Sequence, residues 1–165
     1  MMRFVPYIIY LLAIACFRTL LIDLTAIGRA QILFTALVVL MVTLGKAYLP
    51  ALWFAWVAGL VYDAPDPSHM GVHMLVLAIL SIGTSYAKER LNLDSIKSLM
   101  VLLTAGLVVY SVPATLIYAT SGSEGFFYLF LTTALPSVAY TAAIGWLFFM
   151  VRFGHLSWTK IKSIF

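Results

Sequence analysis

The sequence predicts an all-α polytopic membrane protein, with six transmembrane helices joined by short loops in one integral membrane domain covering residues 1–165. Of its 165 residues, 64% are hydrophobic and only 10% are charged, and the mean hydropathy is +1.06. Such a composition is typical of chains whose solvent is lipid. The apolar runs that would form the spans are 4–22, 30–44, 49–62, 70–87, 99–119 and 126–151.

The first run is expected to remain as a span, although it begins like a secretory signal. Small residues precede Cys16, but apolar sequence continues past it to residue 22. Cys16 is the only cysteine, which excludes an internal disulfide and a cysteine-based metal site. Arg18 lies in the outer part of this run, where a guanidinium group either reaches towards the membrane surface or pairs with an acid.

The second and third runs are joined by a tight turn. Gly45 is suited to the carboxyl end of one helix and Pro50 to the first turn of the next. The third run is short for a bilayer that needs about 20 helical residues, so we expect neighbouring helices to shield it. Trp53 and Trp56 near its start are typical of aromatic anchors at a membrane interface.

The stretch between the third and fourth runs carries the polar residues that matter most. Ala55, Gly59 and Asp63 are four residues apart, so they share one helical face. Small residues on such a face let a second backbone come close. Asp63 falls at the negative carboxyl end of its helix, where an ionised acid needs a positive or donating partner. The candidates are the free amides near Gly71, at the start of the next helix, and Arg18.

The fourth run continues this site with a small, polar face. His73, Leu77, Ser81 and Ser85 are four residues apart and are expected to face the other helices. Serines in this setting usually donate hydrogen bonds across helices or to their own backbone, which favours packing over catalysis.

The last two runs are long and apolar, and each contains a proline. Pro113 and Pro136 are expected to kink their helices. Residues 121–125 form the predicted outer hairpin between them. The segment after residue 152 is expected either to lie on the inner membrane surface or to fray into water.

Charge sets the predicted orientation. Threading the six spans alternately through the membrane places eight of the ten basic residues on one side, namely Arg3, Lys46, Lys88, Arg90, Lys97, Arg152, Lys160 and Lys162. Because basic residues collect on the cytoplasmic side, both termini are predicted to be cytoplasmic. Topology therefore explains the net charge of +4, and no nucleic-acid partner is indicated.

One group of residues has the types that could bind a metal. Asp63, Asp66, His69 and His73 cluster around the turn, and the histidines are four residues apart. However, the glutamate that a zinc hydrolase needs between its histidines is missing, and a hydrolase built on Ser68 and His69 lacks the required geometry. We therefore expect no metal, no cofactor and no enzymatic activity.

The frame formed by Gly59, Asp63 and Gly71, G-x-x-x-D-(x7)-G before an apolar helix, resembles the signature of the MreD family of bacterial rod-shape-determining inner-membrane proteins. Length, short loops and six spans agree with that family along nearly the whole chain. The turn departs from it, because Asp66 and Pro67 replace a sequence that is usually rich in glycine and serine.

The resemblance implies a multi-pass protein of the bacterial cytoplasmic membrane that acts without catalysis. It would bind an MreC-like protein and other membrane proteins of the elongation complex, within the lipid bilayer, and support peptidoglycan synthesis. An alternative is a small-molecule-binding membrane subunit resembling those of energy-coupling-factor vitamin transporters; a metal permease using His69 and His73 is a third. The residues expected to pack helices or contact a partner are Ala55, Gly59, Asp63, Gly71, His73 and Arg18.

Overall fold

The computed structural model describes residues 5–21, 29–65, 70–90, 96–121 and 125–162, and all regular elements in these ranges are helices. The elements are α1 (Val5–Cys16), the π-helical turn η1 (Phe17–Leu21), α2 (Phe34–Gly45), α3 (Tyr48–Asp63), α4 (Val72–Arg90), α5 (Ile96–Ser121), α6 (Phe126–Leu129), the π-helical turn η3 (Phe130–Ala134) and α7 (Leu135–Lys162). The prediction of an all-helical chain is therefore confirmed.

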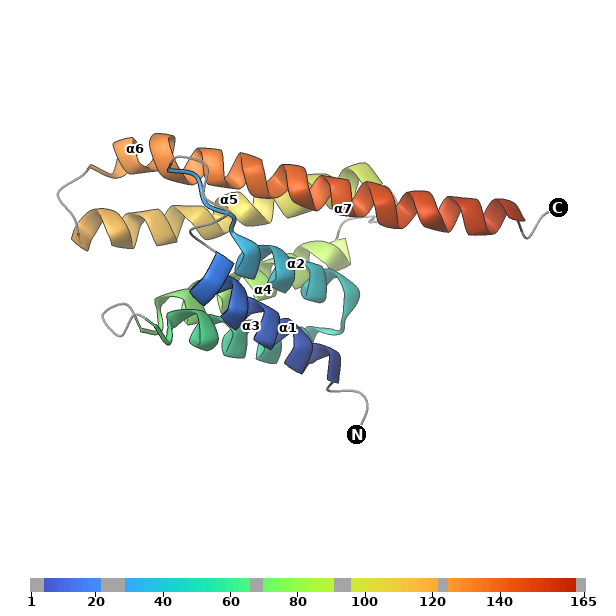
Figure 1. The fold of residues 1–165 in the computed structure, drawn as a ribbon, viewed down its shortest axis with the longest axis horizontal. Helices are drawn as coiled ribbons and strands as arrows, with labels where there is room; N and C mark the ends of the chain where they lie inside the picture. Colours follow the sequence, from blue (N-terminus) through green and yellow to red (C-terminus); the bar gives the residue numbers. More distant parts are fainter. Residues whose placement is uncertain (1–4, 22–28, 66–69, 91–95, 122–124, 163–165) are drawn as a thin grey trace.

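The helices form two groups that share one core. Helices α5 and α7 lie side by side as a long pair, and α1 to α4 pack beside that pair (Figure 1). The C-terminal end of α7 projects past the other helices. Helix α2 is central, because it contacts α1, α3, α4, α5 and α7.

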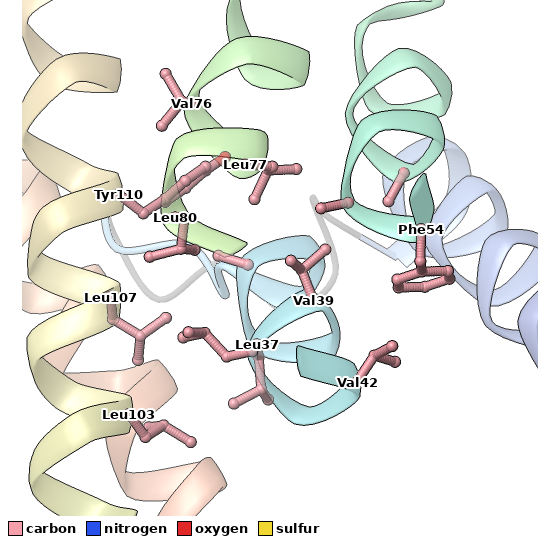
Figure 2. Packing of buried hydrophobic residues seen from close by; sticks show 14 of the residues in the cluster. Leu37, Val39, Val42, Phe54, Val76, Leu77, Leu80, Leu103, Leu107 and Tyr110 are labelled. Atoms are coloured by element: carbon pink, nitrogen blue, oxygen red, sulfur yellow. The ribbon is translucent and has the colours of Figure 1, made fainter. Parts of the chain in front are cut away.

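Apolar side chains from both groups meet around α2. Leu37 of α2 lies towards Leu103 and Leu107 of α5, while Val39 lies on the side of α4 and α3 (Figure 2). Leu80 of α4 belongs to the same cluster and is almost fully buried. Burying a leucine or valine side chain contributes about 1.5–3 kcal/mol in water, and in lipid the close packing itself is the main gain. The core therefore joins the two groups into one body.

Each predicted apolar range contains a helix, but the second helix begins later than expected. Residues 30–33 are not helical, and α2 starts at Phe34. The backbone amides of Gln31 and Leu33 donate to the hydroxyls of Ser137 and Thr141 on α7, each over 2.9 Å. These hydroxyls satisfy the two amides without a helical turn, which is how irregular backbone persists among packed helices.

The π-turn η3 ends at Ala134, two residues before Pro136. A proline in a helix has no amide proton and its ring collides with the carbonyl four residues earlier, which is that of Thr132. A wider turn at this place accommodates the ring without ending the helix.

Within the described residues, two helices are long and apolar enough to cross a membrane, Lys97–Ile117 and Phe126–Met150. Tyr7–Leu20 and Phe34–Gly45 are shorter apolar helices. In the most apolar 18-residue window of each, 44% and 28% of the residues are buried, so both segments also carry residues that are not buried inside the protein. Composition thus allows two membrane-spanning helices, and the other four spans stay predictions.

Candidate functional site at the junction of α3 and α4

Helices α3 and α4 come into backbone contact at Gly59. A Cβ atom added there would overlap the Cα atom of Met74 and lie 2.6 Å from the Met74 nitrogen and 2.9 Å from the His73 carbonyl carbon. Ala55, one turn earlier on the same face, is fully buried. The predicted close approach along this face is therefore confirmed, and Gly59 is the point where only a hydrogen fits.

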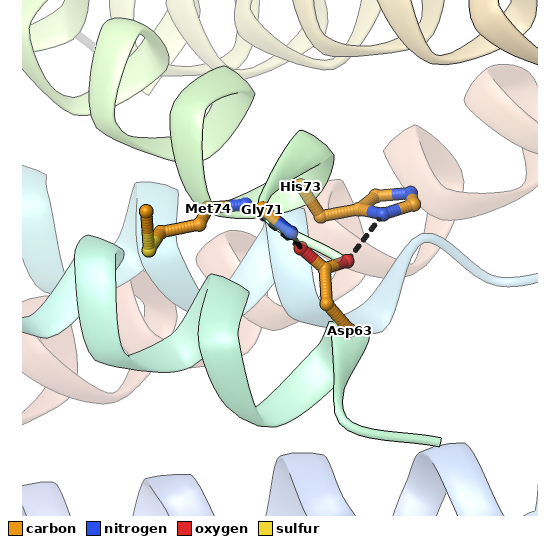
Figure 3. Close-up of polar contacts among 4 residues, drawn as sticks. All are labelled: Asp63, Gly71, His73 and Met74. Carbon is orange, nitrogen blue, oxygen red and sulfur yellow. Dashed lines mark hydrogen bonds and ion pairs between the residues drawn. The ribbon is translucent and has the colours of Figure 1, made fainter. Parts of the chain in front are cut away.

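Asp63 joins the end of α3 to the beginning of α4. Its Oδ2 atom accepts hydrogen bonds from the backbone nitrogens of Gly71, at 2.9 Å, and Met74, at 3.4 Å (Figure 3). The carboxylate thereby caps the amino end of α4, where free amides and the helix dipole favour negative charge. The expectation that Asp63 meets the next helix is confirmed.

His73 completes the set of donors around the carboxylate. Its Nδ1 atom lies 2.7 Å from Asp63 Oδ1, and both side chains are buried. An ionised carboxylate can only accept hydrogen bonds, so we assign the imidazole proton to Nδ1. Both oxygens of Asp63 are then satisfied by α4 (Figure 3).

Gly71 allows the chain to turn into α4. Its φ angle is +94°, a region that residues with a Cβ atom rarely adopt, and its carbonyl accepts the Leu75 amide at 3.0 Å. This backbone conformation aims the Gly71 nitrogen at Asp63. The glycine is thus required by the turn and not by lack of space, because among the described residues no atom lies within 4 Å of an added Cβ atom.

Aromatic rings surround the imidazole. The ring of Tyr62 lies 4.5 Å from that of His73, and the ring of Tyr110 from α5 lies 6.1 Å away. Tyr110 is almost fully buried. The rings fix the imidazole against α3 and α5, so the junction of α3 and α4 is also held to the long helix pair.

The polar face of α4 is turned inward as expected. His73, Leu77, Ser81 and Ser85 are all buried. The hydroxyls of Ser81 and Thr43 on α2 lie 3.3 Å apart, a hydrogen bond between helices of the predicted kind.

The alternative pairing of Asp63 with Arg18 was wrong. The guanidinium carbon of Arg18 lies 4.7 Å above the ring of Tyr62, and the one ion pair that Asp63 makes within the described residues is with His73. The donors of α4 occupy both carboxylate oxygens, which leaves Arg18 a neighbour of the site's aromatic shell and not a partner of the acid.

The possible metal cluster is only partly described. Asp66, Ser68 and His69 lie outside the described residues, and among those that are described no group of three metal-ligating side chains occurs. Asp63 and His73 are bound to each other. The hydrogen bond between them links the end of α3 to the first turn of α4.

The hydroxyls of α7 that hold residues 30–33 are a feature that sequence reasoning missed. Ser137 donates to the Thr133 carbonyl and Thr141 to that of Ser137, while each accepts a backbone amide from the chain before α2. Their four-residue spacing on an apolar helix was the available signal.

Comparison of the chain with models of known protein families, with curated proteins and with solved structures finds no match in any of the three.

Proposed function

We propose that this chain is a non-enzymatic, multi-pass scaffold of the bacterial cytoplasmic membrane that binds an MreC-like partner in the rod-shape machinery and supports peptidoglycan synthesis. One observation carries the proposal. Gly59, Asp63 and Gly71, the residues of the frame that resembles MreD proteins, each have a separate structural task at one junction.

The three tasks depend on each other. Gly59 brings α4 against α3, Gly71 turns the chain so that its amide faces back, and Asp63 accepts that amide. If two glycines and an acid matched the frame by chance, there would be no reason for all three to act at the same helix junction. The frame therefore describes one folded unit, which supports reading it as a family signature.

The outer surface supports a location in the membrane. Large apolar side chains are exposed on several helices, including Leu12 on α1, Ile79 on α4, Val101 on α5 and Leu147 on α7, each more than 60% exposed. Water would oppose so many exposed apolar groups, whereas lipid suits them. Six spans with cytoplasmic termini would place the turn between α3 and α4 on the outer side, where a periplasmic partner could reach it.

The hydrogen bonds of Asp63 suit a structural role. Both oxygens of this buried carboxylate accept hydrogen bonds from the start of α4, so the acid links α3 to α4. The acid rigidifies the junction, and a rigid surface suits the binding of another protein.

Depletion of the protein in its own bacterium tests this proposal. We expect rod-shaped cells to become round, and an MreC-like protein to co-purify with the wild-type chain in mild detergent. Gly59→Ala should fail to restore the rods, while Gly83→Ala should restore them, because an added Cβ atom at Gly83 meets nothing within 4 Å. Unchanged cell shape together with a purified protein that retains a vitamin would instead identify the transporter subunit.

A further inference from the structure

Arg18 is held in position just beyond the carboxyl end of α1. It lies in the π-turn η1, next to Phe17, whose ring stacks on that of Phe34 at 4.5 Å. Its guanidinium carbon lies 4.7 Å from the centroid of Tyr62, on α3. Contacts from α2 and α3 thus orient this segment.

The positive charge of Arg18 has no counter-ion within the part of the chain that the structure describes. The nearby acid, Asp63, is engaged by Gly71, Met74 and His73. The Nε atom of Arg18 is buried and makes no hydrogen bond within the described residues. The side chain as a whole is only partly buried, so part of it faces outward.

An arginine with no counter-ion among the described residues carries a cost between apolar helices, and the cost falls when an anion reaches the guanidinium group. The planar guanidinium carries two parallel N–H groups that match two oxygens of a phosphate. Tyr62 covers one face of the group and leaves its edge as the binding side.

We propose that Arg18 binds a phosphate oxyanion beyond the carboxyl end of α1, supplied by the headgroup of a phospholipid or by soluble phosphate. The ligand oxygens accept hydrogen bonds from the terminal nitrogens of Arg18, while the Tyr62 ring holds the guanidinium plane. This site is independent of the scaffold proposed above, because it uses neither the capping of α4 nor a protein partner.

Arg90 is a matched control. Its guanidinium carbon lies 4.8 Å from the centroid of Tyr86, nearly the same stacking distance as in Arg18. Arg90 is exposed, at the end of α4, and its Nε atom is not among the buried atoms that lack a hydrogen bond. The two arginines therefore share a positive charge and a stacking contact with a tyrosine ring. They differ in burial, because Arg90 is exposed and only Arg18 has a buried Nε atom without a hydrogen bond among the described residues.

The experiment titrates the delipidated full chain in detergent with three probes and follows bound ligand by native mass spectrometry. The probes are phosphatidylglycerol, diacylglycerol, which lacks the phosphate, and inorganic phosphate. The wild-type chain should bind at least one of the two phosphate-containing probes, phosphatidylglycerol or inorganic phosphate. It should not bind diacylglycerol. Arg18→Gln should weaken that binding by about tenfold or more, the effect of losing charge-assisted hydrogen bonds, while Arg90→Gln should leave it within about twofold.

The probes separate the two sources. Binding of phosphatidylglycerol without competition from inorganic phosphate identifies a lipid headgroup, and binding of inorganic phosphate alone identifies a soluble anion. Equal binding by wild type and Arg18→Gln, or equal losses in Arg18→Gln and Arg90→Gln, would overturn the site. If Arg18→Gln does not fold, Arg18→Lys replaces it. Lysine keeps the charge without the paired donors, so its binding must be weaker than that of wild type for the site to stand.

Discussion

Glycines bring helices together in two regions of this molecule, and what they meet is different. At the junction of α3 and α4, Gly59 faces the backbone of Met74 and His73. Between the long helices, Gly145 of α7 faces methyl groups of Leu37 and Leu103, at 3.0–3.1 Å from an added Cβ atom. A backbone cannot move aside without shifting its helix, whereas the end of a leucine side chain can rotate.

The first region is therefore a fixed joint and the second an adaptable one. The fixed joint also contains the buried pair of Asp63 and His73, whose hydrogen bonds require defined distances. The adaptable one consists mainly of apolar side chains such as Leu103 and Leu107. A site that must hold a shape for a partner belongs in the first kind of region, and substitutions should separate the two.

The largest effect is expected for Gly59→Ala. Its Cβ atom would overlap the backbone of Met74, so α4 must move away from α3 and the Asp63 hydrogen bonds lengthen with it. We expect a loss of about 3 kcal/mol or more in the free energy of unfolding, the upper part of the range for overpacking. Reversible unfolding in mixed detergent micelles measures it.

Gly83→Ala is the control for this substitution. It lies in α4 as well, but its added Cβ atom meets nothing within 4 Å, so the higher helix propensity of alanine should leave stability unchanged or raise it by up to about 1 kcal/mol. Equal losses at positions 59 and 83 would contradict the idea of a fixed joint. The first carbon atom of any side chain at position 59 already collides with the backbone of Met74.

Removal of the Asp63 carboxylate should have the next largest effect. Asp63→Ala leaves the amides of Gly71 and Met74 and the His73 imidazole without their acceptor, so we expect a loss of about 3 kcal/mol. Asp63→Asn keeps one oxygen for the amides and removes the charge, and about 1–3 kcal/mol is expected. The same unfolding assay compares the two variants, and equal stability of wild type and Asp63→Ala would show that the buried pair does not hold the joint.

The sequence predicted the fixed joint better than the adaptable region because its requirements are strict. Four-residue spacing put Ala55, Gly59 and Asp63 on one face, and an acid before a turn predicted a cap on the next helix. Each inference rested on a group with few alternatives: a glycine that permits contact, or a carboxylate that needs donors.

Other features could not be predicted for a physical reason. A π-turn changes the direction of the following side chains, so periodicity did not show that Arg18 would lie on Tyr62. Residues 30–33 belong to an apolar run, and hydrophobicity alone does not separate helical from extended backbone there. Their hydrogen-bond acceptors, Ser137 and Thr141, are more than 100 residues away, and pairing over such a distance leaves little local trace.

A smaller effect is expected for Gly71→Ala, which tests the turn without adding a collision. The φ angle of +94° is unfavourable for alanine, so about 1–2 kcal/mol should be lost, and the cap on α4 should weaken because the Gly71 amide turns away from Asp63. Hydrogen exchange of the amides in the first turn of α4 measures the cap directly. An unchanged exchange rate would show that this backbone conformation is not needed to place the amide.

The smallest effect is expected for Gly145→Ala, which places a methyl group in the adaptable region. The methyl groups of Leu37 and Leu103 must move by a few tenths of an ångström, a cost that the gain in helix propensity of about 1 kcal/mol largely offsets. We expect a net change within about 1 kcal/mol in the unfolding assay, between the results for Gly83→Ala and Gly59→Ala. A loss as large as that at Gly59 would mean that the leucines are as rigid as backbone. The fixed joint and the adaptable region would then differ in composition but would tolerate an added methyl group equally poorly. The long helix pair would become an equally good candidate for the surface that a partner recognises.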